Sequence, residues 1–209
     1  MHYRPKYTAF TAALVMLWNP ASAQIAFDNY GPGIGFNFAQ SDIFAGPGAL
    51  GSDLDVGIGF DAQASGRIGT IELALGLFAG SNSLSIEIYD SNGALPGTLL
   101  YNSGPLEGLL RPIGQNFSPV AVDIAEAVTL LLGERYFIIA SANGDTEAIW
   151  HRISIGDLGP AVGQTNNTGF GVSTRARNTA RVTLVPAPSG LTACLFLALT
   201  GTCRRRATR

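Results

Sequence analysis

The sequence predicts an all-β fold: an antiparallel β-sandwich or jelly-roll-like domain, flanked by an N-terminal signal helix and a C-terminal short transmembrane helix. Apolar and polar residues alternate at period two through the middle of the chain, as in strands with one buried face. Clusters of Gly, Pro, Asn and Asp separate these segments at short spacing. The two ends instead hold uncharged apolar stretches beside basic residues. We therefore expect three parts, at residues 1–23, 24–184 and 185–209.

Residues 1–23 have the order of a secretory signal peptide. Arg4 and Lys6 give a basic start, and residues 8–18 form an apolar stretch too short to span a bilayer. Small residues then follow at the spacing that signal peptidase requires, so we expect cleavage after residue 23 and export of the rest of the chain. The predicted cleavage site consists of Ala21, Ala23 and Gln24.

The first third of the body is rich in Gly and Asp. Between residues 24 and 66 we expect long loops around one or two edge strands. Residues 71–77 and 84–88 each place their apolar positions on one face, and the Gly-Ser-Asn-Ser segment between them favours a β-hairpin. Further strands are predicted at 98–101, 120–124, 128–132, 136–140, 148–153, 170–174 and 181–185.

One segment of the body allows two interpretations. Asp123 and Glu126 have the spacing to cap a short helix that runs through Ala127. The Val128-Thr129 pair that follows favours a return to a strand. Both alternatives stay open at the level of the sequence.

Charge and cysteine content exclude several classes of protein. Only 13 % of the residues are charged, and residues 24–188 hold seven arginines and no lysine against fifteen acids, a net charge of −8. Nucleic acid binds to clustered basic residues, so the acidic body argues against a nucleic-acid partner. Cys194 and Cys203 both lie in the tail, so we expect no disulfide in the body.

The body shows no sequence motif for catalysis, and we expect it to be non-enzymatic. It contains one histidine, His151, no cysteine and no Gly-x-Ser-x-Gly elbow. His151 follows Trp150 in a predicted strand, where a histidine is more often a cross-strand partner than a catalytic base. A pair of carboxylates on different strands has no characteristic spacing in the sequence, so a glycoside-cleaving pair remains an alternative to the non-enzymatic prediction.

Two kinds of binding residue are candidates in the body. Asp53, Asp55 and Asp90 lie in acidic turns that offer oxygen ligands to calcium, although such turns also arise for backbone reasons alone. We expect no other cofactor. Four aromatic side chains are candidates for stacking on sugar rings, although isolated aromatic residues in a sandwich are mostly core or edge residues: Tyr30, Tyr89, Tyr101 and Trp150.

The C-terminal tail has three consecutive features. A proline motif is followed by an uncharged stretch at 189–203, and the chain ends in an arginine cluster at 204–209. The 14 residues from Gly190 to Cys203 would span about 21 Å as a helix, less than the ~30 Å hydrocarbon thickness. This length favours a transient anchor in the inner membrane, with the arginines on the cytoplasmic side. The sorting residues are Val185, Pro186, Ala187, Pro188, Arg204, Arg205 and Arg206.

This ordered tail resembles the PEP-CTERM sorting signal. The resemblance implies recognition by an exosortase, cleavage near the proline motif, and transfer to the cell surface or to exopolysaccharide. Ala187 stands where the family usually has Glu, which implies a processing enzyme that accepts alanine. Residues 85–100 and 128–137 are similar to the choice-of-anchor extracellular domains, which implies a β fold and an extracellular setting without transferring catalytic residues.

Together these features predict an exported structural or adhesive protein at the cell surface or in the extracellular matrix. Its expected partners are signal peptidase, an exosortase-like enzyme, the membrane through the tail helix, and an exopolysaccharide. The alternative is a carbohydrate-binding module or a glycan-active secreted enzyme. A binding module needs an exposed row of aromatic residues on one sheet face, whereas an enzyme needs carboxylates that converge in a cleft.

Overall fold

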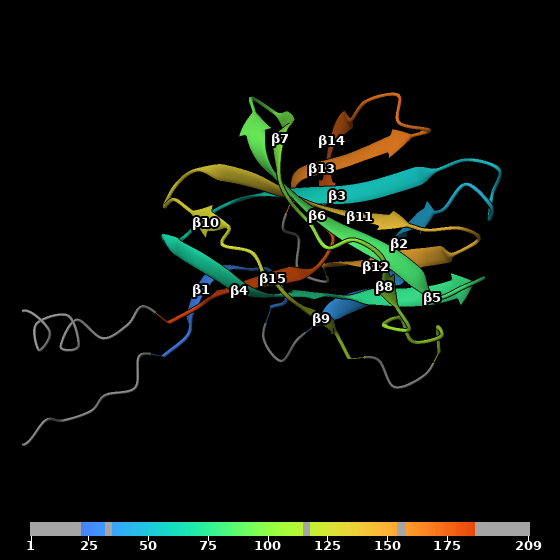
Figure 1. The fold of residues 1–209 in the computed structure, drawn as a ribbon, viewed down its shortest axis with the longest axis horizontal. Coiled ribbons are helices and arrows are strands. Elements are labelled where there is room, and N and C mark those ends of the chain that lie inside the picture. Colours follow the sequence, from blue (N-terminus) through green and yellow to red (C-terminus); the bar gives the residue numbers. More distant parts are fainter. Residues whose placement is uncertain (1–21, 32–34, 115–117, 154–157, 187–209) are drawn as a thin grey trace, which may run out of the picture. The chain divides into compact units, whose positions relative to one another are not determined.

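The computed structural model describes residues 22–31, 35–114, 118–153 and 158–186. Within these ranges the chain is all-β, and every pairing between its named strands is antiparallel (Figure 1). None of the described segments forms a helix long and apolar enough to cross a membrane. The predicted signal helix and tail helix lie outside the described residues.

The described strands form two sheets. The smaller sheet has the order β1-β15-β4-β10, and β9 also pairs with β4. Gln24, the first residue of β1, is the register partner of Leu184, the last residue of β15. The five strands are β1 (Gln24–Asp28), β15 (Ala180–Leu184), β4 (Gly66–Leu73), β10 (Thr129–Leu130) and β9 (Val120–Asp123).

The larger sheet has ten described strands in the order β5-β12-β2-β3-β11-β6-β7, with β13 and β14 attached through β3, and β8 through β6. The strands are β5 (Leu75–Ala79), β12 (Glu147–Ile153), β2 (Phe36–Ala45), β3 (Leu54–Asp61), β11 (Arg135–Ala142), β6 (Ser83–Asn92), β7 (Leu95–Asn102), β13 (Leu158–Thr165), β14 (Gly171–Ala176) and β8 (Leu106–Glu107). The strands predicted at 136–140 and 148–153 lie within β11 and β12, so these two predictions are confirmed.

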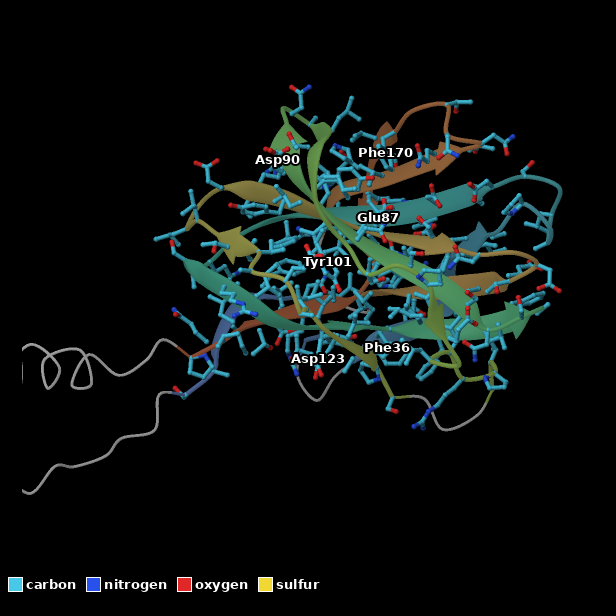
Figure 2. The ribbon with its side chains drawn as sticks, viewed as in Figure 1. Phe36, Glu87, Asp90, Tyr101, Asp123 and Phe170 are labelled. Carbon is cyan, nitrogen blue, oxygen red and sulfur yellow. The ribbon has the colours of Figure 1, made fainter. Side chains whose placement is uncertain are left out.

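Both sheets contribute to one hydrophobic core. Ile71 of β4 and Val182 of β15 belong to the same buried cluster as Ile58 of β3 and Ile138 of β11. Each of these strands alternates, so one face is buried in this core and the other face is left for different contacts. Figure 2 shows the side chains that fill the space between the strands.

The predicted hairpin between 71–77 and 84–88 is wrong. The chain leaves the smaller sheet at Leu73 and enters the larger one at Leu75, where β5 pairs with β12. Both leucines are fully buried in the shared core, so the alternating pattern continues through the change of sheet. Alternation alone therefore gave no sign that the chain crosses from one sheet to the other.

The prediction of long loops at 24–66 is also wrong, although β1 is an edge strand of the smaller sheet, as expected. This segment forms β1, β2 and β3, and β3 lies inside the larger sheet, between β11 and β13. The glycines of β3 reflect close packing: a Cβ added at Gly57 would meet the side chains of Ile139 and Val162. Glycine here marks a crowded strand and not a loop.

The segment that joins β9 to β10 contains no helix, so the strand alternative is the correct one. Only Thr129 and Leu130 of the predicted strand at 128–132 pair, opposite Arg67 and Gly66 of β4. Ile124 donates its backbone N–H to Gly69 at 2.8 Å, which keeps the segment against β4.

Candidate functional site

A polar pocket lies on the larger sheet, on the face opposite the shared core. In β6, Leu84, Ile86 and Ile88 enter the core, so Ser85 and Glu87 point to the other side. The neighbouring strand β11 places Ser141 directly opposite Ser85. The pocket is thus built on adjacent strands of one sheet, whose backbone fixes the spacing of its side chains.

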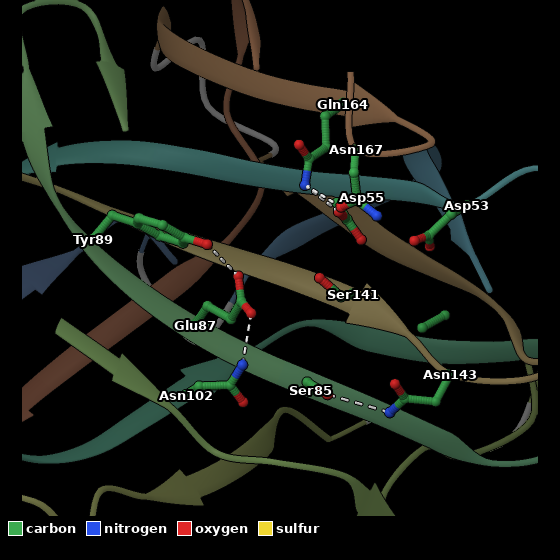
Figure 3. A pocket seen from close by; sticks show the side chains of 11 residues that line it. Asp53, Asp55, Ser85, Glu87, Tyr89, Asn102, Ser141, Asn143, Gln164 and Asn167 are labelled. Atoms are coloured by element: carbon green, nitrogen blue, oxygen red, sulfur yellow. Dashed lines mark hydrogen bonds between the residues drawn. The ribbon is translucent and has the colours of Figure 1, made fainter. Parts of the chain in front are cut away.

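The pocket has a volume of about 300 Å³, and polar side chains supply almost all of its lining. They come from β3, β6, β7, β11, β13 and the turns beside them (Figure 3). The lining residues are Asp53, Asp55, Ser85, Glu87, Tyr89, Asn102, Ser141, Ala142, Asn143, Gln164 and Asn167. Hydroxyl, amide and carboxylate groups together can both donate and accept hydrogen bonds, which suits a polar ligand.

A small apolar cluster supports the pocket on the same face of the sheet. Phe137, Ile139 and Val162 are buried there, and Tyr89 and Phe170 pack against them. The rings of Tyr89 and Phe170 meet edge to face at 5.8 Å between centroids. Tyr89 therefore has its ring held by packing while its hydroxyl group lines the pocket.

Glu87 is held by two donors. The Tyr89 hydroxyl donates to Glu87 Oε2 and the Asn102 amide donates to Glu87 Oε1, each at 2.7 Å. Burial and the hydrogen bond to Glu87 raise the pKa of the Tyr89 phenol far above its usual range, so it stays a donor. Each oxygen of the Glu87 carboxylate thus has a partner within the protein.

Asp55 has a different environment. It is only 5 % exposed, and its Oδ2 accepts a hydrogen bond from Gln164 Nε2 at 2.6 Å. Its Oδ1 is buried and has no hydrogen-bond partner among the described residues. Gln164 lies opposite Asp55 in the pairing of β13 with β3, so the strand register places the donor.

Asp53 adds a second carboxylate at the same end. Burial, together with the charge of Asp55, raises the pKa of Asp53 above its usual value. The turn after β13 ties this segment down: Asp53 N donates to Asn166 Oδ1 at 2.8 Å, and Asn166 N donates to Asp53 O at 2.7 Å. Asn166 and Asn167 both have positive φ angles, of 49° and 55°, a conformation that Asn adopts more readily than most residues.

The pocket contains no compensating basic group. None of the described residues that line it is Lys, Arg or His. Four of the body's arginines are paired with acids elsewhere: Arg135 with Asp61, Arg152 and Arg175 with Asp42, and Arg181 with Asp28 and Glu72. The local charge is therefore negative.

The three predicted calcium ligands do not lie together. Asp53 and Asp55 line the pocket, whereas Asp90 is not among its lining residues. Asp90 lies further along β6 (Figure 2), where its carboxylate accepts a hydrogen bond from Thr98 N in the hairpin with β7. In the part of the chain that the structure describes, no three or more His, Cys, Asp and Glu side chains form a group that could hold a metal ion.

The other candidate residues lie away from the pocket. His151 is buried in β12 beside the ring of Phe36, at 5.3 Å between centroids, and burial lowers the pKa of its imidazole. Trp150 and Tyr30 are fully buried and Tyr101 is nearly so, which leaves Tyr89 as the candidate aromatic residue that lines the pocket. Trp150 Nε1 donates to Thr179 O at 2.9 Å, as expected for a core tryptophan.

Of the predicted sorting and cleavage residues, Ala23 and Gln24 lie at the start of the described body, and Val185 and Pro186 at its end. Val185 N donates to Arg67 O at 2.8 Å. Ala21, Ala187, Pro188, Arg204, Arg205 and Arg206 lie outside the described residues.

Comparison of the chain with protein-family models, with curated proteins and with solved structures finds no match.

Proposed function

We propose that this chain is an exported, non-enzymatic structural or adhesive protein of the cell surface, and that its body is a β-sandwich or jelly-roll-like domain. The observation that carries the proposal is the polar pocket on the outward face of the larger sheet. Sugar hydroxyl groups both donate and accept hydrogen bonds, so hydroxyl, amide and carboxylate side chains fixed on strands suit contact with an extracellular polysaccharide.

The two ends of the body support the proposed sorting. The first residue expected after signal cleavage, Gln24, begins β1, and the predicted proline motif starts directly after Leu184, which ends β15. These two residues are paired in register, so removal of either end at its predicted site would leave the sheet intact. An exposed junction beside a folded domain is accessible to a processing enzyme.

Fractionation of the native host tests export and sorting. The mature protein should begin at Gln24, lack Arg209 and occur at the surface or in the matrix, as mass spectrometry of both termini can establish. Replacing Arg204, Arg205 and Arg206 by Ala should release unprocessed protein, because the arginines are expected to stop translocation. Replacing Pro186 and Pro188 by Ala should leave full-length protein in the membrane. Wild-type protein in the soluble fraction that still ends in Arg209 would contradict the proposal.

Polysaccharide binding can be tested separately by sedimentation with purified exopolysaccharide from the same host. Glu87→Gln should weaken binding about tenfold, since a lost hydrogen bond to a charged group is worth roughly 1.5 to 3 kcal/mol. Asp123→Asn is the matched control, because Asp123 lies on β9 of the smaller sheet and bonds Thr70. Equal binding by both variants would exclude the pocket as the contact.

A glycan-active enzyme is the second candidate, and one observation favours it. Asp53, Asp55 and Glu87 line the same pocket, and glycoside cleavage uses two carboxyl groups. Both Glu87 oxygens already accept hydrogen bonds, which favours a fixed binding group over an acid or base. Release of reducing ends from the exopolysaccharide by wild type, abolished in Asp55→Asn, would establish the enzyme instead.

A further inference from the structure

The Asp55 end of the pocket contains an acceptor that the described protein does not satisfy. Asp55 is 95 % buried, and its Oδ1 has no hydrogen-bond partner among the described residues, although its Oδ2 accepts a hydrogen bond from Gln164. A buried carboxylate oxygen without a partner costs free energy, because its hydration is lost and nothing replaces it. The strands that hold Asp55 and Gln164 are paired in register, so the carboxylate cannot turn away without losing its bond to Gln164.

The surroundings determine what chemistry would satisfy this oxygen. Asp53 brings a second carboxylate to the same end of the pocket. The pocket lining includes no Lys, Arg or His among the described residues. A bound cation would both ligate Asp55 Oδ1 and neutralise the two acids.

We propose that the Asp53–Asp55 end of the pocket binds a calcium ion, with Asp55 Oδ1 as its fixed ligand and Asp53 as the second carboxylate. Neutral oxygens that line the same pocket, the Ser141 hydroxyl and the Asn167 amide, are the available further ligands, with water. Figure 3 shows these side chains around one hollow. The inference depends on the pocket alone and requires neither export nor polysaccharide binding.

The ligand types favour calcium among the common divalent ions. The pocket offers oxygen and no sulfur or imidazole group, so it is unsuited to zinc. Magnesium demands a near-ideal octahedron and keeps much of its water, whereas calcium accepts mixed carboxylate, amide and hydroxyl oxygens in flexible geometry. Two carboxylates, with no third acid close enough within the described ranges to complete an acidic cage, predict weak binding, with a Kd of about 0.1 to 1 mM, as in extracellular calcium modules.

The test uses the full-length chain in mild detergent, stripped with EDTA and titrated with calcium chloride by calorimetry and by thermal melting. A hundredfold excess over Kd should raise Tm by about 5 to 10 °C. Asp55→Asn should weaken calcium binding at least about tenfold, and Asp53→Asn should also weaken it. Asp90→Asn is the matched control, since it removes the same charge outside the pocket, and it should keep the wild-type affinity.

Several outcomes would overturn the proposal. The first is a wild-type chain that shows neither a heat of calcium binding nor a shift in Tm in calcium chloride. The second is an Asp55→Asn chain that binds calcium with wild-type affinity. The third is a Tm shift in magnesium chloride equal to that in calcium chloride. If Asp55→Asn does not fold, Asp53→Asn replaces it as the decisive variant. No polysaccharide is present in these assays, so a negative result leaves the proposed polymer contact untouched.

Discussion

Asp42 and Asp55 lie on the neighbouring strands β2 and β3 and are buried to nearly the same extent, with 7 % and 5 % exposure. Asp42 is surrounded by cations: Arg152 reaches it at 2.6 Å and Arg175 at 3.0 Å. Asp55 has one amide donor, Gln164, and one oxygen that no residue in the described part of the chain bonds. The larger sheet thus holds one buried acid, Asp42, that is paired with two arginines. It holds another, Asp55, with one oxygen that no described residue bonds.

The contrast between Asp42 and Asp55 distinguishes an acid that stabilises the fold from an acid that is available to a ligand. A buried carboxylate paired with two guanidinium groups holds strands together, because its charge and its hydrogen bonds are satisfied within the fold. A buried carboxylate oxygen without a hydrogen bond destabilises the fold, because its lost hydration is not replaced. The cation that we propose for the pocket would supply the partner that Asp55 Oδ1 lacks among the described residues.

Substitution of Asp42 should give the largest loss. Asp42→Asn leaves Arg152 and Arg175 without their common partner and should cost about 2 kcal/mol of unfolding free energy. The value is below that of a fully buried pair because both arginine side chains remain partly exposed to water. Urea unfolding measures it, and calcium should not change it.

Asp61→Asn is the control for this prediction. Asp61 also pairs with an arginine, Arg135, but both side chains are exposed, by 56 % and 38 %. Water and salt screen such a pair, so its loss should cost about 0.5 kcal/mol or less. Equal losses in the two variants would mean that burial does not distinguish Asp42.

A smaller loss of stability is expected at the Glu87 end of the pocket, where both carboxylate oxygens accept hydrogen bonds. Tyr89→Phe keeps the ring against Phe170 but removes the donor to Glu87, which should cost about 1 kcal/mol of stability. Calcium affinity should stay within about twofold of wild type, because Glu87 is not among the proposed ligands. If Tyr89→Phe is as stable as wild type, the hydrogen bond from Tyr89 to Glu87 does not contribute to stability.

The smallest effect concerns Asp53 and its pH dependence. Because its folded pKa is raised, the folded chain binds this proton more tightly than the unfolded chain. The resulting stabilisation is present below the unfolded pKa of about 4 and is lost as pH rises through the folded pKa. In EDTA at pH 7, Asp53→Asn should therefore be more stable than wild type, by about 0.5 kcal/mol.

Calcium should reverse this order, since the variant loses a proposed ligand. Urea unfolding of both chains at pH 4 and pH 7, with and without calcium, tests the reversal. A variant less stable than wild type in EDTA at pH 7 would contradict the assigned direction of the pKa shift.

Local pattern was sufficient for much of the fold. Period-two alternation is a property of each strand by itself, and it located β11 and β12. The same pattern misled the prediction where contacts between segments distant in sequence determine the structure. The glycines of β3 are required by neighbours distant in sequence, Ile139 and Val162, and the passage from Leu73 to Leu75 keeps its pattern because both sheets bury residues in one core.

The candidate site was predictable only in part. Asp53 and Asp55 were visible in the sequence as an acidic segment that offers oxygen ligands to calcium. Glu87, Asn102 and Gln164 join them through strand register, and Asn167 joins them from the turn after β13. A single sequence specifies neither arrangement. Asp90 was wrongly grouped with Asp53 and Asp55. Its turn has a similar composition, but its carboxylate accepts a hydrogen bond from the backbone N–H of Thr98.

The most direct test compares Asp55→Asn with Asp42→Asn by urea unfolding of the full-length chain, first in EDTA and then in calcium chloride at about 100 times Kd. In EDTA, Asp55→Asn should be as stable as wild type or more so, while Asp42→Asn is destabilised. Calcium should stabilise wild type and Asp42→Asn by about 2.7 kcal/mol, and Asp55→Asn by no more than about 1.4 kcal/mol, because a tenfold higher Kd leaves calcium at only about 10 times Kd. If Asp55→Asn loses as much stability as Asp42→Asn in both buffers, Asp55 is a structural residue and the account of the pocket is contradicted.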